Sequence, residues 1–294
     1  MEYSICLPYM EAGYDRGTTL DWCREIDAGP FATLSCGERV ISYSQDMRVL
    51  LSAAAALTAR VRIMPSLYVL PMHSAVRAAK EIATLDVLSG GRVRVGVGVG
   101  GREQDYRALG VPFDRRHQRL DDAVSEMRRV WRGQPVFEGG EAVGPAPFQP
   151  GGPAIYSGAM GPKAIARAAH WADGLYGFTV NADPAPARAQ FDLARGAWEQ
   201  AHREEAPRLM TGFWFSLADD AAGKLERYVF EYLKVAGTEI AKAMAAAMVA
   251  NNSDTILRAI DAIEELGCDE LFFVPATLEL VELERLCKLL SRRG

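Results

Sequence analysis

The sequence has few cysteines and histidines, and neither residue type is arranged as a metal site or a disulfide framework. The 294 residues include five cysteines and four histidines. The cysteines are odd in number and widely spaced, without a CxxC pair, which fits a reducing compartment. No HExxH motif or tight His/Cys cluster is present. We therefore expect no metal centre, and we expect the cysteines to be small buried side chains. They are Cys6, Cys23, Cys36, Cys268 and Cys287.

Long apolar runs and an excess of basic charge are also missing. No uncharged stretch approaches the roughly 20 residues of a membrane-spanning helix. The N-terminal MEYSICLPYM has neither the basic region nor the apolar core of a signal peptide. The formal net charge is −5 and the 33 basic residues are scattered, so no nucleic-acid-binding surface is expected. These absences predict a cytoplasmic globular enzyme that binds neither membranes nor nucleic acids.

The most informative segment runs from residue 69 to residue 110. Apolar residues from Ala75 to Leu85 recur every three or four positions, which predicts a helix, and Ser74 is a suitable cap for its start. The turn Ser89-Gly90-Gly91 ends this helix. From Val93 to Val99, β-branched residues alternate with other residues, glycine among them, as in a strand that another backbone approaches closely. Helix, turn and strand in this order predict a βαβ unit of a parallel sheet.

Strand-like runs occur eight times along the chain, with helix-period stretches between most of them. This alternation and the length of 294 residues predict a single (β/α)8 TIM barrel domain over residues 1–294. The expected strands are 3–7, 32–35, 61–70 with a break at Pro65, 93–99, 154–157, 175–179, 209–217 and 270–274, and the expected helices between them include 47–58, 74–88, 117–131 and 163–172.

The C-terminal third contains more chain than one barrel repeat requires. Residues 183–251 include two helical stretches, 185–203 and 221–250. We expect this enlarged helical region to be either an outer layer or dimer surface, or a lid over the barrel mouth. The sequence leaves both interpretations open.

A dinucleotide-binding fold is the alternative to the barrel. The run Gly96 to Gly101 matches GxGxxG, and Asp121 and Asp122 stand about twenty residues later, as a ribose ligand would. However, its first two glycines fall inside the predicted strand, and the next clear helix begins only after Phe113-Asp114. The tight turn from strand to helix that holds a pyrophosphate is therefore missing, and we favour the barrel.

Several motifs up to about residue 180 resemble the luciferase-like flavin and deazaflavin oxidoreductases. The run from Ala79 to Arg92 is similar to the family signature Ala-Lys-x-x-Ala-x-Leu-Asp-x-Leu-Ser-Gly-Gly-Arg, and a glycine-rich strand follows it. Gly37-Glu38-Arg39-Val40, Gly158-Ala159-Met160-Gly161-Pro162-Lys163 and Ala172-Asp173-Gly174 extend the likeness. The resemblance implies a barrel with a cofactor ring across its C-terminal mouth, a small organic substrate and a homodimer.

The segment from Gly158 to Lys163 is the predicted phosphate cradle of that cofactor. It joins an expected strand to an expected helix, and Pro162 suits the first helical turn. Unpaired backbone N–H groups at a helix start attract phosphate, and Lys163 adds a positive charge. The competing interpretation is a plain glycine turn followed by a solvated lysine. The residues predicted to bind the cofactor here are Gly158, Ala159, Met160, Gly161, Pro162 and Lys163.

Glu38 and Glu103 are the predicted catalytic residues. Glu38 comes just past the second strand, where a carboxylate can exchange a proton with a substrate. Alternatively, Glu38 and Arg39 anchor the loop through ion pairs. Glu103 follows Gly100 and Gly101, which can pass close beneath a ring system. We expect Glu38 to be the more important of the two, and both glycines to bind the cofactor.

Two further features follow from the resemblance. Many flavin-type relatives place a histidine after the second strand, but none occurs here before His73, which argues against the oxygen-using luciferase mechanism. We expect His73 to be a loop residue rather than a base. Relatives also commonly have a non-prolyl cis peptide at the end of strand three, which supports the cofactor ring. Ser66, Val69 and Leu70 are the predicted contacts there, with Val69-Leu70 as the cis bond.

The resemblance favours the branch that uses the deazaflavin coenzyme F420, because the Gly-Glu-Arg and Met-Gly-Pro-Lys motifs look like that branch. We therefore expect hydride transfer between F420 and an organic substrate. One alternative is an FMN-dependent monooxygenase that receives reduced flavin from a partner reductase and activates oxygen. Another is a non-catalytic flavin-binding barrel.

Overall fold

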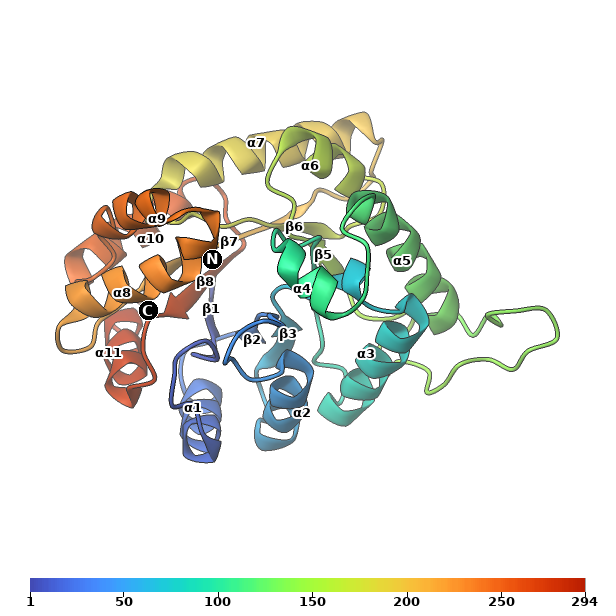
Figure 1. Ribbon diagram of the computed structural model, residues 1–294, viewed down its shortest axis with the longest axis horizontal. Coiled ribbons are helices and arrows are strands. Elements are labelled where there is room, and N and C mark those ends of the chain that lie inside the picture. The colour runs from blue at the N-terminus through green and yellow to red at the C-terminus, as the bar shows by residue number, and fades with distance from the viewer. Residues whose placement is uncertain (294) are drawn as a thin grey trace.

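Eight parallel strands form a barrel with helices around it (Figure 1), as seen in a computed structural model that describes residues 1–293. Their hydrogen-bonded order is β3-β2-β1-β8-β7-β6-β5-β4. The remaining seam, between β3 and β4, is bridged at Ile63 with Val93 and at Tyr68 with Val97. The predicted (β/α)8 fold is therefore confirmed. The strands are β1 Glu2–Cys6, β2 Thr33–Cys36, β3 Arg62–Pro65, β4 Val95–Val97, β5 Ile155–Ser157, β6 Gly174–Tyr176, β7 Arg208–Phe215 and β8 Glu270–Pro275.

Helices follow the strands and cover the outside of the barrel (Figure 1). A long connection without helix or strand, residues 132–154, extends away from the barrel beyond α3 and α5. The helices are α1 Arg16–Ala28, α2 Met47–Leu57, α3 Ala75–Ser89, α4 Glu103–Ala108, α5 Arg116–Trp131, α6 Pro162–Ala168, α7 Pro184–Gln200, α8 Ala221–Leu233, α9 Thr238–Ala246, α10 Ser253–Glu264 and α11 Leu280–Leu290, with the short 3₁₀ helices η1 Leu70–Met72 and η2 Lys234–Ala236.

Residues of the signature run, Ala79 to Arg92, and the N-cap Ser74 before it stabilise α3 and the segments around it. Ser74 caps the helix, since its Oγ accepts from the Arg77 N–H, and Gly90 ends it at a φ of 69°, where side chains are disfavoured. The buried carboxylate of Asp86 accepts from the backbone N–H and the amide of Gln149, which ties down the end of the long connection. Arg92 donates to the carbonyl of Ala55 in α2 and to those of Thr58 and Val61, between α2 and β3. These residues hold the barrel seam rather than a ligand.

The third predicted strand is shorter than expected. β3 ends at Pro65 and η1 begins at Leu70, so residues 66–69 form a bulge rather than a strand. The cis peptide is Ser66–Leu67, so the choice of Val69–Leu70 within this stretch was wrong. Leu70 begins η1, where its N–H donates to the Tyr68 carbonyl and its side chain is fully buried in the core. Tyr68 completes the seam to β4 instead.

Other sequence-based boundaries also need correction. The helix predicted over residues 221–250 is two helices, because Gly237 has a φ of 122°, which no α-helical residue adopts. The helix predicted over 163–172 ends at Ala168. The predicted loop after the fourth strand contains α4.

The dinucleotide-binding alternative is wrong, because Gly96 lies inside a barrel strand, and a Cβ there would be 2.7 Å from the Pro65 carbonyl oxygen.

The amino-terminal end of the barrel is filled by a charged network. Glu270, at the start of β8, is 1% exposed and its Oε1 accepts from the hydroxyls of Ser4 and Thr33, both at 2.6 Å. Arg62 and Arg208 pair with the same carboxylate at 3.3 and 3.0 Å. Both oxygens of this buried carboxylate therefore have partners, as burial of a charge requires.

Neither a membrane span nor a metal centre is found in the described part of the chain. Among residues 1–293, no helix has both the length and the apolar character needed to cross a bilayer. The same residues contain no group of three or more His, Cys, Asp or Glu side chains placed to hold a metal ion.

Candidate active site

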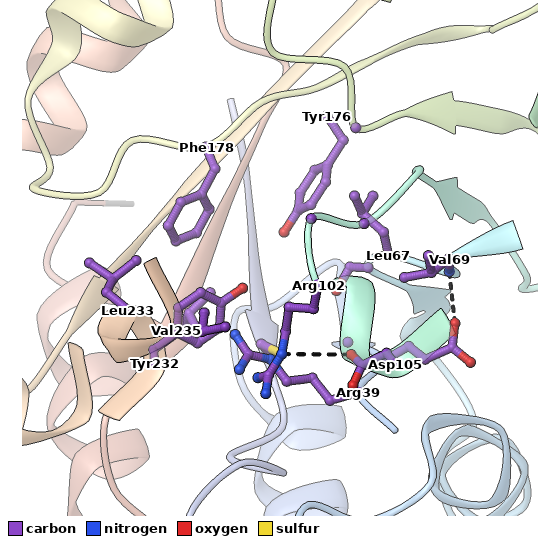
Figure 2. A pocket seen from close by; sticks show the side chains of 18 of the residues that line it. Arg39, Leu67, Val69, Arg102, Asp105, Tyr176, Phe178, Tyr232, Leu233 and Val235 are labelled. Atoms are coloured by element: carbon purple, nitrogen blue, oxygen red, sulfur yellow. Dashed lines mark hydrogen bonds and ion pairs between the residues drawn. The ribbon is translucent and has the colours of Figure 1, made fainter. Parts of the chain in front are cut away.

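A cavity of about 510 Å³ opens at the carboxyl-terminal end of the barrel (Figure 2). All eight strands contribute to it through the residues at or just past their ends, as is usual for barrel enzymes. The volume lies within the range of small-molecule sites, about 300 to 1,000 Å³. The strand-end lining comprises Cys6, Tyr9, Gly37, Glu38, Arg39, Ser66, Leu67, Val69, Gly100, Gly101, Arg102, Gly158, Met160, Tyr176, Gly177, Phe178, Val180, Trp214 and Val274.

Two apolar walls face each other across this cavity (Figure 2). Leu67 and Val69, from the bulge after β3, lie on one side. Phe178, which follows β6, lies on the other with residues of α8 and η2. The residues from α8 and η2 are Tyr228, Tyr232, Leu233 and Val235. The enlarged C-terminal region thus supplies part of the cavity wall.

Leu67 forms a platform that is made possible by neighbouring glycines. A Cβ on Gly98 would lie 2.6 Å from Leu67 Cδ1, and a Cβ on Gly158 would overlap the same atom. A Cβ on Gly100 would lie 2.8 Å from Val69 Cγ1. Glycine at these positions therefore lets the bulge lie close against β4 and β5, with its side chains covering the floor of the cavity.

Glu38 lies on the cavity wall with both carboxylate oxygens engaged. Its side chain is 6% exposed; Oε2 accepts from the Val69 N–H at 2.7 Å, and Oε1 lies 2.7 Å from Nε2 of His73. His73 also packs edge-on against the Tyr68 ring. The carboxylate therefore holds the bulge that carries Val69, and the His73 imidazole lies beside it. Glu38 thus contacts the bulge after β3 and His73, and no ion pair of Arg39 is found among residues 1–293.

A second carboxylate, Asp105 of α4, stands nearby in the cavity wall. Its Oδ1 accepts from the Ile41 N–H at 2.9 Å, and its Oδ2 lies 3.8 Å from Arg102 Nε. Tyr106, next in the helix, donates from its hydroxyl to the Val99 carbonyl. Through these contacts α4 connects the loop that follows β2 with the segment just past β4 at the rim of the cavity.

Several polar groups in the cavity keep their protons. Burial raises the pKa of Tyr9 and Tyr176 well above the ordinary value of a phenol, and burial raises the pKa of the Cys6 thiol to about 12. At neutral pH these groups are hydrogen-bond donors rather than anions. The buried Oγ of Ser66 has no hydrogen-bond partner among residues 1–293, and Ser66 lines the cavity. Such an atom is suited to the polar edge of a bound ligand.

The structure brings about half of the predicted site residues together. Those that line the cavity are Glu38, Ser66, Val69, Gly100, Gly101, Gly158 and Met160. The others do not line it: Glu103 begins α4, Leu70 is buried in the core, and Ala159 borders a small adjoining cavity beside α5. Gly161, Pro162 and Lys163 stand at the start of α6, outside the lining of the main cavity.

Sequence reasoning missed the aromatic part of the site. Tyr176 and Phe178 occupy alternate positions at the end of β6, and Trp214 lies in β7. Tyr228 and Tyr232 are four residues apart in α8, which places them on one helix face. The helical spacing was visible in the sequence, but the direction of that face was not.

Comparisons with known proteins agree with this architecture. Residues 1–272 match the family described as luciferase-like monooxygenase. An uncharacterized protein of Mycobacterium tuberculosis is 33% identical over 173 residues, 56% of this chain and 60% of that protein. The 5,10-methylenetetrahydromethanopterin reductase of Archaeoglobus fulgidus is 33% identical over 110 residues, 36% of this chain and 33% of the reductase. The chain therefore spans less than two thirds of the length of these curated relatives.

Solved structures share the fold over almost the whole chain. Monooxygenase RslO1 from Streptomyces bottropensis superposes with a TM-score of 0.78 at 22% identity, covering 99% of this chain and 98% of that one. An F420-dependent secondary alcohol dehydrogenase gives 0.78 at 18% identity, covering 98% of each chain. Identities this low show the fold alone, whereas the family match extends over most of the sequence. The chain belongs to the luciferase-like monooxygenase family.

Proposed function

We propose that this protein is an oxidoreductase that transfers a hydride between coenzyme F420 and a small organic substrate. The observation that carries the proposal is the cavity at the carboxyl end of the barrel, where the Leu67 platform faces an aromatic wall. A flat heterocycle needs an apolar surface on one face and room for its substrate on the other. These two walls supply both.

The residues present fit a cofactor of this kind. Gly100 and Gly158 leave room for Val69 and Leu67 to form an apolar floor in the cavity, and the unpartnered Ser66 Oγ offers a donor to a polar ring edge. We propose that the loop from Gly158 to Lys163 holds the phosphate of the cofactor. Arg167 borders the small cavity beside this loop, and burial, with the charges of Arg116 and Arg167, lowers the pKa of His117 there. Asp121 lines the same cavity and pairs with Arg167, so Lys163 is the candidate cation for the phosphate.

When bound, the cofactor would supply the two-electron chemistry. The chain itself excludes water with its apolar walls and moves the proton. Glu38 is our first candidate for proton exchange, since it lines the cavity and contacts His73, which can share the proton. Glu103 is the weaker candidate, because it does not line the cavity. The Tyr9 and Tyr176 hydroxyls donate hydrogen bonds to substrate or ring oxygens without losing their protons.

The similarities also support an FMN-dependent alternative. A 3,6-diketocamphane monooxygenase of Pseudomonas putida, solved in complex with FMN, superposes with a TM-score of 0.75 at 15% identity, covering 99% of this chain and 97% of that one. 2,5-Diketocamphane 1,2-monooxygenase 2 of the same organism is 27% identical over 133 residues, 41% of this chain and 36% of that enzyme. Three observations favour F420. The Gly-Glu-Arg and Met-Gly-Pro-Lys motifs resemble that branch, the reductase of Archaeoglobus fulgidus has the higher identity, and the loop after β2 offers Glu38 where flavin-type relatives often have histidine.

The test is a pair of titrations on the purified chain. F420 and FMN are added separately while tryptophan fluorescence is followed, since Trp214 lies in the cavity wall. We expect saturable binding of F420, weaker binding of FMN, and no oxygen consumption with reduced FMN. Tight FMN binding with oxygen uptake would instead establish the monooxygenase. If neither compound binds, the oxidoreductase proposal fails.

A further inference from the structure

Arg39 stands in the wall of the cavity without an acidic partner. It follows β2 and lines both the main cavity and a smaller one of about 200 Å³ beside it. Within residues 1–293, no carboxylate lies within ion-pair distance of its guanidinium, and the guanidinium donates no hydrogen bond to the protein. Its guanidinium carbon lies 3.9 Å from the centre of the Tyr232 ring.

The carboxylates near Arg39 are already paired with other groups. Glu11 pairs with Arg227 at 2.9 Å, and Glu231 pairs with Lys234 at 2.5 Å. Asp105 faces Arg102 and accepts from the Ile41 N–H. The positive charge of Arg39 is therefore not balanced by the protein, in contrast to that of Arg102.

The contact with Tyr232 leaves the donors of Arg39 available. A guanidinium that stacks over an aromatic face is stabilised through its flat side, while its N–H groups point outward in the plane. Those groups match the two oxygens of a carboxylate, which is the strongest common partner of arginine. In Figure 2, Arg39 and Arg102 lie between the two walls of the cavity, with Tyr232 beside them.

An apolar surface continues from Tyr232 into the cavity. Trp214 lies 4.7 Å from Tyr232 and 4.8 Å from Phe178, measured between ring centres. Leu233 and Val235 extend the same wall (Figure 2). A ligand that fits this wall has an apolar body of about the size of a ring, and it carries negative charge at the end that faces Arg39.

We propose that the substrate is an organic acid with an apolar ring-sized body, and that Arg39 binds its carboxylate. The inference rests on the proposed function in one respect: the body of the acid lies between the aromatic wall and the face of the redox cofactor. Arg39 is then a specificity-determining residue. Arg102 contributes less, because Asp105 shares its charge.

The experiment compares three probes of similar shape and different charge: benzoate, benzamide and benzylammonium. Calorimetry measures their dissociation constants with the purified chain, alone and with saturating F420 or FMN. We expect benzoate to bind at least about tenfold more tightly than benzamide, and benzylammonium most weakly. Arg39→Met should remove the preference for benzoate, Arg39→Lys should retain part of it, and the exposed Arg24→Met should change nothing.

The affinities for F420 and FMN are measured on the same variants. They should be equal in wild type and Arg39→Met. The proposal is overturned if wild type shows no preference for benzoate, if the preference survives in Arg39→Met, or if Arg39→Met loses cofactor affinity instead, since Arg39 would then bind the cofactor tail. A wild-type chain that prefers benzoate but binds neither cofactor would refute the oxidoreductase proposal and leave the acid site supported.

Discussion

The two ends of the barrel treat polar groups in opposite ways. At the amino-terminal end, the buried Glu270 carboxylate is surrounded by two arginines and two hydroxyls. At the carboxyl-terminal end, Arg39 has no acidic partner among the described residues. The buried Oγ of Ser66 has no hydrogen-bond partner among them either. One end pairs its buried carboxylate with cations of the protein, and the other leaves donors for a ligand. The same strands supply both ends, so the difference comes from a few residues at each rim.

Two buried glutamates sharpen this contrast. Glu270 meets cations at the amino-terminal end, whereas Glu282 of α11, at the carboxyl-terminal end, meets only neutral donors. Its Oε2 accepts from the Ser216 hydroxyl and from the N–H groups of Leu217 and Ala218, while Oε1 has no partner among residues 1–293. Burial raises the pKa of Glu282 to about 7 despite these three hydrogen bonds. Glu282 is thus a buried carboxylate without a cationic partner in the described part of the chain, and burial is the cause of its raised pKa.

The largest expected effect is at the closed end. Glu270→Ala removes one of the two carboxylates that Arg62 and Arg208 share, the other being Glu2, and it leaves the buried hydroxyls of Ser4 and Thr33 without their acceptor. We expect the free energy of unfolding to fall by about 3 to 5 kcal/mol. Urea denaturation followed by circular dichroism measures it. Asp21→Ala, which breaks an exposed pair with Arg24, is the control and should cost less than about 1 kcal/mol. If the two variants are equally stable, the network at the closed end does not support the barrel.

The next effect is at the open end and concerns rate rather than stability. Glu38→Gln keeps an oxygen for the Val69 N–H but cannot exchange a proton, so we expect turnover to fall by about 10² to 10³. The free energy of unfolding should change by no more than about 1 kcal/mol. Stopped-flow absorbance of the cofactor measures the rate across pH. If Glu38 only positions the bulge, the glutamine variant will keep both its turnover and its pH profile.

Glu282 gives the barrel a predictable pH dependence. Its pKa is about 7 in the folded chain and near the ordinary 4.5 after unfolding, so the folded state binds the proton more tightly. That stabilisation is complete below about pH 4.5 and is lost as pH rises through about 7. Between about pH 5 and about pH 8, wild type should therefore lose up to about 3 kcal/mol relative to Glu282→Gln. Denaturation at several pH values measures this difference.

The matched control for this pH dependence is Glu284→Gln, on the exposed side of the same helix. Its stability should follow wild type at every pH. An unchanged slope in Glu282→Gln would show that Glu282 ionises normally in the folded chain.

The pattern of apolar and β-branched residues in the sequence was sufficient to predict the eight strands of the barrel. Each predicted strand corresponds to an observed one, because β-branched and apolar residues repeat in short runs between turn signals. The seam between β3 and β4 and the bulge after Pro65 could not be predicted from this pattern. Whether the chain after Pro65 continues as a strand depends on Tyr68 reaching β4, a contact between segments far apart in sequence. The break at Gly237 looked like a tolerated glycine within a helix.

The candidate site was predictable only where motifs lie at strand ends. Glu38, Gly100 and Gly158 lie just past the ends of β2, β4 and β5, and barrel topology brings such positions together. The partners of Glu38 were not predictable, since His73 is 35 residues away and Val69 contributes a backbone N–H. The aromatic wall was missed for a similar reason. The inward direction of Tyr232 depends on how α8 packs over the mouth, and no local pattern specifies that.

The smallest of these effects tests the floor of the open end. In Gly158→Ala, the new Cβ would overlap Leu67 Cδ1, so Leu67 must move from the platform. We expect the affinity for the cofactor to fall by about tenfold, while the free energy of unfolding changes by less than about 1 kcal/mol, because a leucine end can shift at little cost. Gly196→Ala, in α7 with open space around it, is the control and should leave cofactor affinity unchanged. Fluorescence titration measures both variants. Equal affinity in the two would mean that the ring does not lie on Leu67, and the carboxyl-terminal cavity would then hold its ligand against the aromatic wall alone.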